Sequence, residues 1–258
     1  MTAEDAEPPP DAARGLDLLW GERKRPSRGP KPALSVEQIA QTAIGIADAE
    51  GLAALSMRRV ADELGFTPMA LYRYVPGKHE LVEVMLDVGV GPPPESIAAA
   101  GGWRAQLERW SREIFAIYMR HRWVLDVPLA GLRMGPNRLA WLESALTALD
   151  GTGLTDSEML AATLALDGHP RAMAQIAVAV ESGQGGTDEW SPTFARMLEQ
   201  VIDEEHYPTL SRFLAAGTFH EPAPSDDPGF EFGMHRLLDG IGALIESRDV
   251  ENGRAAST

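Results

Sequence analysis

The stretch LSMRRVADELGFTPMALYRYV, Leu55–Val75, decides the fold of the N-terminal part of this chain. It contains two short segments with apolar residues at helical spacing, separated by the turn Gly-Phe-Thr-Pro. Gly65 suits the reversal because glycine accepts a positive φ without a Cβ clash. Pro68 follows at the first position of the second helix, which tolerates proline best. The sequence therefore predicts a helix-turn-helix.

The ends of both predicted helices carry capping signals. Ser56 stands where it can cap the first helix, and Thr67 stands where it can cap the second. Phe66 and Leu71 occupy the two positions of a hydrophobic staple around Thr67, which sets the angle at which the chain enters a helix. The turn is therefore specified at each step.

The second helix, expected from Pro68 to about Val75, turns polar and aromatic side chains away from its apolar side. Leu71 and Val75 are four residues apart and face inward. The outer surface then carries the remaining large side chains: Met69, Tyr72, Arg73 and Tyr74. Arginine bonds guanine edges or phosphates, tyrosine hydroxyls bond phosphates, and methionine can touch a thymine methyl. This surface is typical of a helix that reads a DNA groove.

The composition is that of a globular protein. Of the 258 residues, 44% are hydrophobic and 24% are charged, which excludes disorder throughout. The absence of cysteine removes disulfides, thiolate nucleophiles and cysteine-bound metals, and it fits a reducing compartment. No apolar run is long enough to span a bilayer, and the acidic, proline-rich start MTAEDAEPPPDAARG is unlike a secretion signal. We therefore expect a cytoplasmic protein without a membrane partner.

Charge is distributed unevenly along the chain. The formal net charge of −15 is unusual for a nucleic-acid binder, because phosphate contacts need Lys and Arg. Between Trp20 and Pro32, however, a single acidic residue stands against five basic ones: Arg23, Lys24, Arg25, Arg28 and Lys31. Acidic residues predominate from Leu81 onward. A basic end on an acidic body presents one face to DNA, and the alternative is a solvated basic linker.

The rest of the chain has helical periodicity and no strand pattern, so the predicted fold is all-α. A capping box of Ser35 and Gln38 opens the first helix of the N-terminal unit. Five later amphipathic runs are expected to form a larger bundle: 103–120, 136–149, 156–182, 191–205 and 230–248. The expected parts are a flexible arm, a three-helix unit containing the helix-turn-helix, the larger domain and a tail: 1–32, 33–80, 81–250 and 251–258.

The segment GLAALSMRRVADELGFTPMALYRYVPGKHELVEVMLD, residues 51–87, closely resembles the DNA-binding segment of tetracycline-repressor-like (TetR family) transcriptional regulators. The matching elements are SMRRVADELG, MALYRYV and the GKHEL that opens the next helix. The preceding LLWGERKRPSRGPKPALS is similar to the basic leader of actinobacterial-type members, so the resemblance covers roughly residues 16–90. More loosely, FEFGMHRLLDGIGALIES resembles the last helix of their C-terminal domain.

The resemblance implies a set of DNA-contacting residues. Ser56 and Arg58 match positions that touch the DNA backbone or a base, and Lys78 matches a lysine that bonds phosphate. The contact face of the recognition helix corresponds to Thr67, Met69, Ala70, Tyr72, Arg73 and Tyr74. Arg25 and Arg28 of the arm are candidates for a minor-groove contact. Because Pro68, Met69 and Ala70 lack side-chain donors, direct base reading depends on Arg73, on the preceding helix that begins after Ser56, and on the arm.

Several of these residues also have a purely structural interpretation. Arg58 and Arg59 can pair with Asp62 or Glu63 on one helix face, at roughly a few tenths of a kcal/mol per pair. Tyr72 can pack against the helix that begins after Ser35 instead of facing DNA. Both interpretations stay open at the level of the sequence.

In the TetR family the second domain forms a homodimer and holds a small-molecule pocket. The candidate pocket residues here are aromatic, Met and His side chains: Trp110, Met119, Trp123, Trp141, His169 and Met173. The candidate dimer residues lie on the last helix, which is expected to join the 156–182 helix in a four-helix interface: Leu237, Leu238, Ile241, Leu244 and Ile245. The alternative for both groups is ordinary core packing.

The predicted function is a ligand-responsive transcriptional regulator, a repressor that binds a palindromic DNA operator as a homodimer and is released by a small molecule. The helix over 77–88, which bridges both domains, is expected to transmit the signal. The alternative is a helical interaction or ligand-binding module without specific DNA binding. An enzyme is not expected, since the chain has no His-Glu-x-x-His, Gly-rich phosphate loop or Gly-x-Ser-x-Gly. Neither a cofactor nor a metal is implied.

Overall fold

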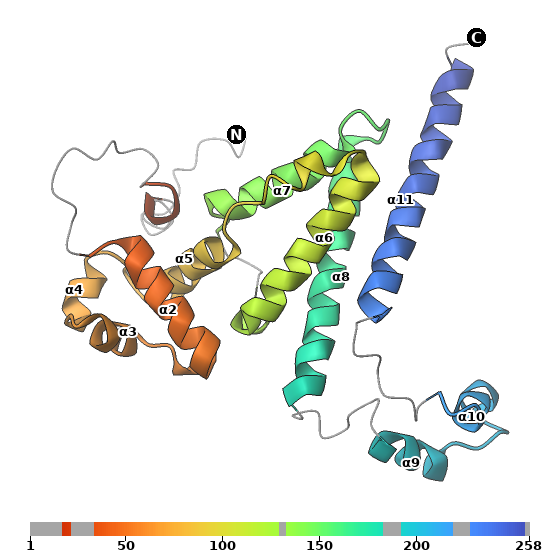
Figure 1. Cartoon of the computed structure of the whole chain (residues 1–258), viewed down its shortest axis with the longest axis horizontal. Coiled ribbons are helices and arrows are strands. Elements are labelled where there is room, and N and C mark those ends of the chain that lie inside the picture. Colours follow the sequence, from red (N-terminus) through yellow and green to blue (C-terminus); the bar gives the residue numbers. More distant parts are fainter. Residues whose placement is uncertain (1–16, 22–33, 129–132, 183–191, 219–227, 256–258) are drawn as a thin grey trace, which may run out of the picture.

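A computed structural model gives the arrangement of most of the chain (Figure 1). The residues that it describes are 17–21, 34–128, 133–182, 192–218 and 228–255. Within these ranges the regular elements are helices and no strand occurs, which confirms the all-α prediction. None of the helices so described has the length and apolar character needed to cross a bilayer. The predicted arm residues Arg25 and Arg28 lie outside the described residues.

The N-terminal unit consists of three helices around a small core. They are α2 (Val36–Glu50), α3 (Met57–Leu64) and α4 (Pro68–Tyr72), with a short 3₁₀ turn, η2 (Leu52–Ala54), between the first two. Ser35 accepts a hydrogen bond from the backbone of Gln38, whose side chain accepts one in return, so the predicted capping box is present. The core is built from residues at the predicted helical spacing: Ile39, Ala43, Val60, Ala61 and Leu71.

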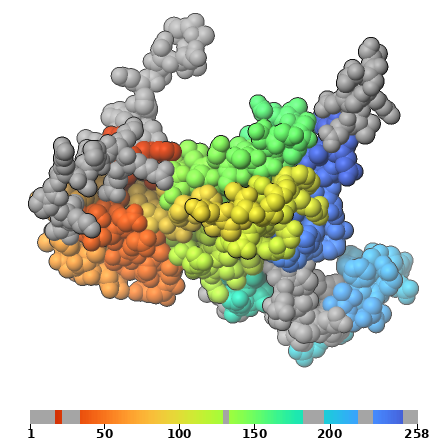
Figure 2. Space-filling model, turned by 45° about the horizontal axis from the view of Figure 1, so that its top comes forward, coloured from red at the N-terminus to blue at the C-terminus, as the bar shows by residue number. Residues whose placement is uncertain are grey.

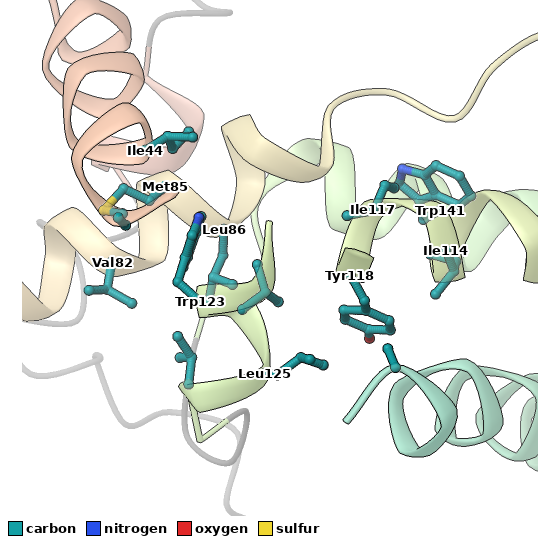
Figure 3. Packing of buried hydrophobic residues seen from close by; sticks show 14 of the residues in the cluster. Ile44, Val82, Met85, Leu86, Ile114, Ile117, Tyr118, Trp123, Leu125 and Trp141 are labelled. Atoms are coloured by element: carbon teal, nitrogen blue, oxygen red, sulfur yellow. The ribbon is translucent and has the colours of Figure 1, made fainter. Parts of the chain in front are cut away.

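Helix α5 (Lys78–Val90) connects the N-terminal unit to the larger domain. It packs against α2 on one side and against α7 (Pro136–Leu149) on the other. Leu81 and Met85 are completely buried at the junction where α5 meets the N-terminal unit. Figure 3 shows Met85 beside Ile44 of α2. A displacement of α5 relative to α7 would therefore also move the N-terminal unit, because α5 packs against α2.

The larger domain is a bundle centred on α6 (Trp103–Arg120). This helix contacts α7 and two long helices, α8 (Asp156–Ser182) and α11 (Pro228–Ala255). Short 3₁₀ segments precede and follow α6: η3 (Ala98–Ala100) and η4 (Arg122–Asp126). In the space-filling view the orange N-terminal unit and the yellow-green bundle form one continuous body (Figure 2).

The boundaries of α6, α7 and α8 agree with the predicted runs, whereas two later predictions need correction. The run 191–205 was expected as one helix, but α9 ends earlier (Pro192–Val201) and a separate helix, α10 (Pro208–Ala215), follows. These two helices pack mainly on each other, beyond the ends of α8 and α11 (Figure 1). The last helix also continues to Ala255, into the segment expected to be a tail.

Candidate nucleic-acid interface and ligand pocket

The turn between α3 and α4 has the predicted geometry. Gly65 lies in the left-handed region with φ of 72°. The N–H of Phe66 donates to the carbonyl of Ala61 at 2.9 Å, a bond that closes the end of α3 as in a Schellman motif. Ser56 caps α3 by accepting from the backbone of Arg59 at 3.1 Å. Thr67 is the N-cap residue of α4, as predicted, and its side chain makes no capping hydrogen bond.

The outer face of α4 consists of exposed side chains on a buried support. Met69 is 72% exposed and Tyr72 is 46% exposed, while Leu71 is completely buried. Arg73 is exposed at the end of α4, and it has no ion-pair partner among the described residues. Tyr74 differs from the expectation, because it is half-buried and packs against the core. It lies three residues after Leu71 and therefore shares the inward side of the helix.

The basic residues around this face divide into paired and available groups. Arg59 bonds Glu50 at 2.9 Å and Glu63 at 2.6 Å, as the structural interpretation anticipated. The Arg58 side chain is 85% exposed and lies 3.8 Å from Asp62, a distance at which an exposed pair contributes little. Lys78 is exposed at the start of α5. Arg58, Arg73 and Lys78 are thus the cations that this part of the structure leaves available to an external anion.

A polar cluster ties the N-terminal unit to the bundle. Asp48, near the end of α2, lies 2.9 Å from Nδ1 of His121 and accepts a hydrogen bond from the indole of Trp123 at 2.9 Å. Trp123 was expected in a ligand pocket, but it is buried at this junction (Figure 3). It lines a separate depression on the other side of the junction from the cavity described below. Its role here is to hold two parts of the chain together.

Two buried carboxylates on α5 bind the segment 133–138. Glu83 accepts hydrogen bonds from the backbone of Arg133 at 3.0 Å and from its guanidinium at 2.9 Å. One turn later, Asp87 accepts from the backbone of Arg138 at 3.0 Å. A Cβ atom on Gly135 would lie only 2.3 Å from the Asp87 carboxyl carbon, so only glycine permits this approach. The sequence signal, two acids one turn apart in a buried helix, was overlooked.

Part of the N-terminal arm is anchored at the same place. Residues 17–20 form a helical turn. The indole of Trp20 donates to the carbonyl of Met134 at 3.3 Å. Leu18 and Leu19 face a small cavity shared with α5 and the start of α7. Residues 17–21 of the arm therefore pack beside α5 and the start of α7.

A cavity of about 310 Å³ lies between α5, α6, α7 and α8. Its walls include Trp110 and Trp141, as predicted, together with Tyr118, which points from α6 toward α8 (Figure 3). The indole of Trp110 donates to the carbonyl of Trp141 at 3.0 Å, and that of Trp141 donates to the carbonyl of Gly91 at 2.9 Å. Because both indole N–H groups are used, these rings offer only apolar faces to the cavity.

The other predicted pocket residues lie elsewhere. Nε2 of His169 is 2.8 Å from the carbonyl of Phe230, on which the imidazole stacks. His169 also lies against Gly233, so it packs α8 against α11. Met119 and Met173 are partly buried and pack against the core. Helical periodicity identified these residues as inward-facing, but it could not say which of several interior spaces each one enters.

The predicted dimer residues are also divided by the structure. Leu238, Ile241 and Ile245 are buried within the chain, where α11 meets α6 and α8, and Leu237 is half-buried against the core. Leu238, Ile241 and Ile245 therefore pack within the chain rather than on its surface. Leu244 is exposed, and the other exposed large apolar side chains of α8 and α11 were not predicted: Leu160, Leu164, Ile176, Val180 and Phe232. Both long helices thus carry apolar side chains that are exposed in the described part of the chain.

A helix-turn-helix with an outward second helix, joined by a buried helix to a bundle that encloses a cavity, defines a DNA-binding regulator with a ligand domain. The family model "Bacterial regulatory proteins, tetR family" matches residues 39–85, and "Tetracyclin repressor-like, C-terminal domain" matches residues 97–245. The chain belongs to the TetR family. This confirms the resemblance, and the family consists of DNA-binding regulators rather than enzymes.

Similar proteins of known name or structure come from actinobacteria. The HTH-type transcriptional repressor DrrR1 of Streptomyces coeruleorubidus is 43% identical over 248 residues, covering 94% of this chain and 90% of the relative. An HTH-type transcriptional regulator of Saccharopolyspora erythraea is 27% identical, with coverage of 94% and 98%. The structure of Streptomyces coelicolor ActR in complex with actinorhodin has a TM-score of 0.65 and 27% identity, with coverage of 83% and 97%.

Proposed function

We propose that this chain is a cytoplasmic transcriptional repressor that binds a palindromic operator as a homodimer and is released by a small molecule. The observation that carries the proposal is the outward face of α4, where Met69, Tyr72 and Arg73 stand exposed on a buried support. A relative with 43% identity is named a repressor, and ActR has been solved with actinorhodin bound. These relatives support the direction of regulation and the presence of a small-molecule effector.

In this proposal the residues of the N-terminal unit have separate roles. Arg73 bonds a guanine edge or a phosphate, and Tyr72 and Lys78 bond phosphates. Ser56, Arg58 and Thr67 approach the backbone from the ends of α3 and α4, while Met69 and Ala70 make apolar contacts to bases. The half-buried Tyr74 supports the helix and offers at most its hydroxyl.

The proposed dimer is formed by α8 and α11 of two copies. Phe232 of α11 is 68% exposed, and Ile176 and Val180 of α8 are also exposed apolar side chains. A second copy with the same surface covers them symmetrically, because a two-fold interface uses one patch on both subunits. The two α4 helices then reach half-sites roughly 34–36 Å apart, one turn of B-DNA.

The proposed release acts through α5. Leu86 and Val90 of α5 line the cavity, as do Met134 and Arg138 of the 133–138 segment that the α5 carboxylates bind. A ligand that displaces Met134 or Arg138 therefore moves α5 and changes the position of α4 relative to its partner copy. A coupling of about 1–3 kcal/mol changes operator affinity several-fold to over a hundredfold.

The test is a fluorescence-anisotropy titration of the full chain with DNA from upstream of its own gene. Specific binding should exceed binding to a shuffled duplex and should fall steeply with salt, because phosphate contacts release counterions. Absent or salt-insensitive binding favours the alternative, a helical ligand-binding module that does not recognise DNA.

A further inference from the structure

Met69 is the most exposed large apolar side chain in the described part of the chain, at 72%. It lies on the first turn of α4, two residues after the N-cap Thr67. Phe66 and Tyr72, three residues before and after it, are also exposed, and Met69 and Tyr72 share one side of the helix. The thioether of Met69 is therefore open both to DNA and to dissolved reagents that react with sulfur.

The sulfur of this chain belongs to methionine alone, because the sequence contains no cysteine. Apart from Met1, the methionines lie within the described residues. Those that the fold buries or half-buries are Met57, Met85, Met119, Met134, Met159, Met173 and Met234. Besides Met69, only Met197 of α9 is exposed among these described methionines, at 42%. Because oxidation of sulfur follows access, a dissolved oxidant should reach Met69 first.

Hydroperoxides convert methionine to its sulfoxide by transfer of one oxygen atom. The sulfur lone pair attacks the peroxide, so an S–O bond forms as the O–O bond breaks. The leaving hydroxide takes the proton of the transferred hydroxyl and becomes water. The sulfur is thereby oxidised by two electrons and the peroxide is reduced. Methionine sulfoxide reductases return the product to the thioether, so the modification is reversible.

The sulfoxide changes what the side chain of Met69 can contact. A thioether packs well against an apolar group such as a thymine methyl, which is the kind of contact proposed for Met69. The sulfoxide oxygen accepts hydrogen bonds and cannot donate them. Phosphates and the groove-edge atoms of guanine and thymine are acceptors as well. Since a polar group that is buried without a partner loses its hydration, oxidation at this position should weaken DNA binding.

The basic side chains of the same unit are left unchanged by this modification. Arg58, Arg73 and Lys78 are exposed, and they keep their charge when Met69 is oxidised. The number of phosphates that a protein neutralises sets how steeply its affinity for DNA falls with salt. Oxidation of Met69 should therefore lower the affinity for a specific duplex while the salt dependence stays the same.

We propose that Met69 is an oxidation site through which hydroperoxides reversibly weaken the binding of this protein to its operator. The reacting atom is the thioether sulfur, and the reagent is a two-electron oxygen donor. The site lies on α4, whereas the cavity lies between α5, α6, α7 and α8, so an oxidant and a cavity ligand act at different places. The proposal rests on the proposed DNA-binding function and adds a second route to release.

The first experiment treats the full chain with hydrogen peroxide and maps the oxidised methionines over time by peptide mass spectrometry. Met69 should be oxidised first and Met197 more slowly, while the buried Met85 and Met234 remain unmodified over the same period. A bound duplex from upstream of its own gene should slow the oxidation of Met69 and leave that of Met197 unchanged. Faster oxidation of another described methionine, or no protection of Met69 by a bound duplex, overturns the proposal.

The second experiment measures operator affinity by fluorescence anisotropy before and after peroxide treatment. The affinity of the natural chain should fall about tenfold or more, and methionine sulfoxide reductase should restore it. Met69→Leu cannot form a sulfoxide, so its own affinity should be nearly the same before and after treatment. Met69→Gln, which is polar and of similar length, should weaken binding without any oxidant. Met197→Leu is the matched control and should lose affinity on treatment as the natural chain does.

The outcomes separate failure of the oxidation site from failure of the proposed function. An untreated chain that binds no duplex fails the proposed function, and the oxidation site fails with it. A chain that binds its operator equally well after Met69 has been oxidised retains the proposed function and loses only the oxidation site. Equal losses of affinity in the natural chain and in Met69→Leu assign the effect to another residue and also overturn the proposal.

Discussion

The DNA-reading unit and the cavity differ in how far apart in the sequence their residues lie. The face of α4 and its support fall within Leu55–Val75, and each side chain is placed by caps and helical spacing inside that stretch. The cavity collects side chains from Leu86 to Asp167 on four helices. The first surface depends on local geometry, and the second depends on how long helices cross. The two should therefore respond differently to substitution.

The largest expected effect is that of Leu71→Ala, which breaks the DNA-reading unit and spares the cavity. Leu71 is fully buried beneath α4, and such truncations cost about 2–5 kcal/mol. Operator affinity should be lost, while the bundle keeps its helical structure and its buried tryptophans keep their fluorescence. Circular dichroism, tryptophan emission and an operator titration check this. Unchanged melting with full operator affinity would show that α4 does not rest on Leu71.

Gly135→Ala should disturb the connection between the two regions. The added methyl overlaps the Asp87 carboxyl, and overpacking of this kind costs about 1–3 kcal/mol. Since α5 and the 133–138 segment are pushed apart, the variant should melt at a lower temperature and bind operator more weakly. Circular dichroism melting and anisotropy titrations measure these two quantities. Gly45→Ala, where a Cβ meets no neighbouring atom, is the control.

Arg73→Ala tests whether Arg73 recognises a base rather than a phosphate. If Arg73 makes a bidentate contact to guanine, its loss costs about 1–3 kcal/mol of discrimination and relaxes sequence preference. Lys78→Ala should instead weaken all duplexes about equally, because a phosphate contact carries no sequence information. Competition between operator and shuffled DNA distinguishes the two.

The smallest effect concerns the stability of the cavity at different pH. Burial raises the folded-state pKa of Asp167 above its ordinary 3.8, so its ionisation favours the unfolded chain. The carboxyl stabilises the fold fully below its unfolded pKa and loses that contribution as the pH rises through the folded pKa. Asp167→Asn cannot ionise and should melt slightly higher than the natural chain at pH 7. The difference should disappear below about pH 3.8; a constant difference at both pH values contradicts the assignment.

Sequence patterns were reliable where one helix could be considered alone. The capping box at Ser35, the reversal at Gly65 and the limits of α6, α7 and α8 followed from local signals. They failed where two inward-facing roles look alike. His169 and Ile241 have the spacing of pocket or dimer residues, yet both pack within the chain. The periodicity of a helix reports that a side chain is covered, but not what covers it.

The sequence alone determined the reading helix of this protein, because caps, a glycine reversal and helical spacing act within a few residues of one another. Only the tertiary structure decided which groups meet at the junction and in the cavity. Glu83 and Asp87 bind a segment that lies about fifty residues further along the chain. The cavity likewise brings together side chains of α5, α6, α7 and α8, such as Leu86, Trp110 and Trp141. Such pairings depend on the angles and distances between packed helices, and those are properties of the whole chain.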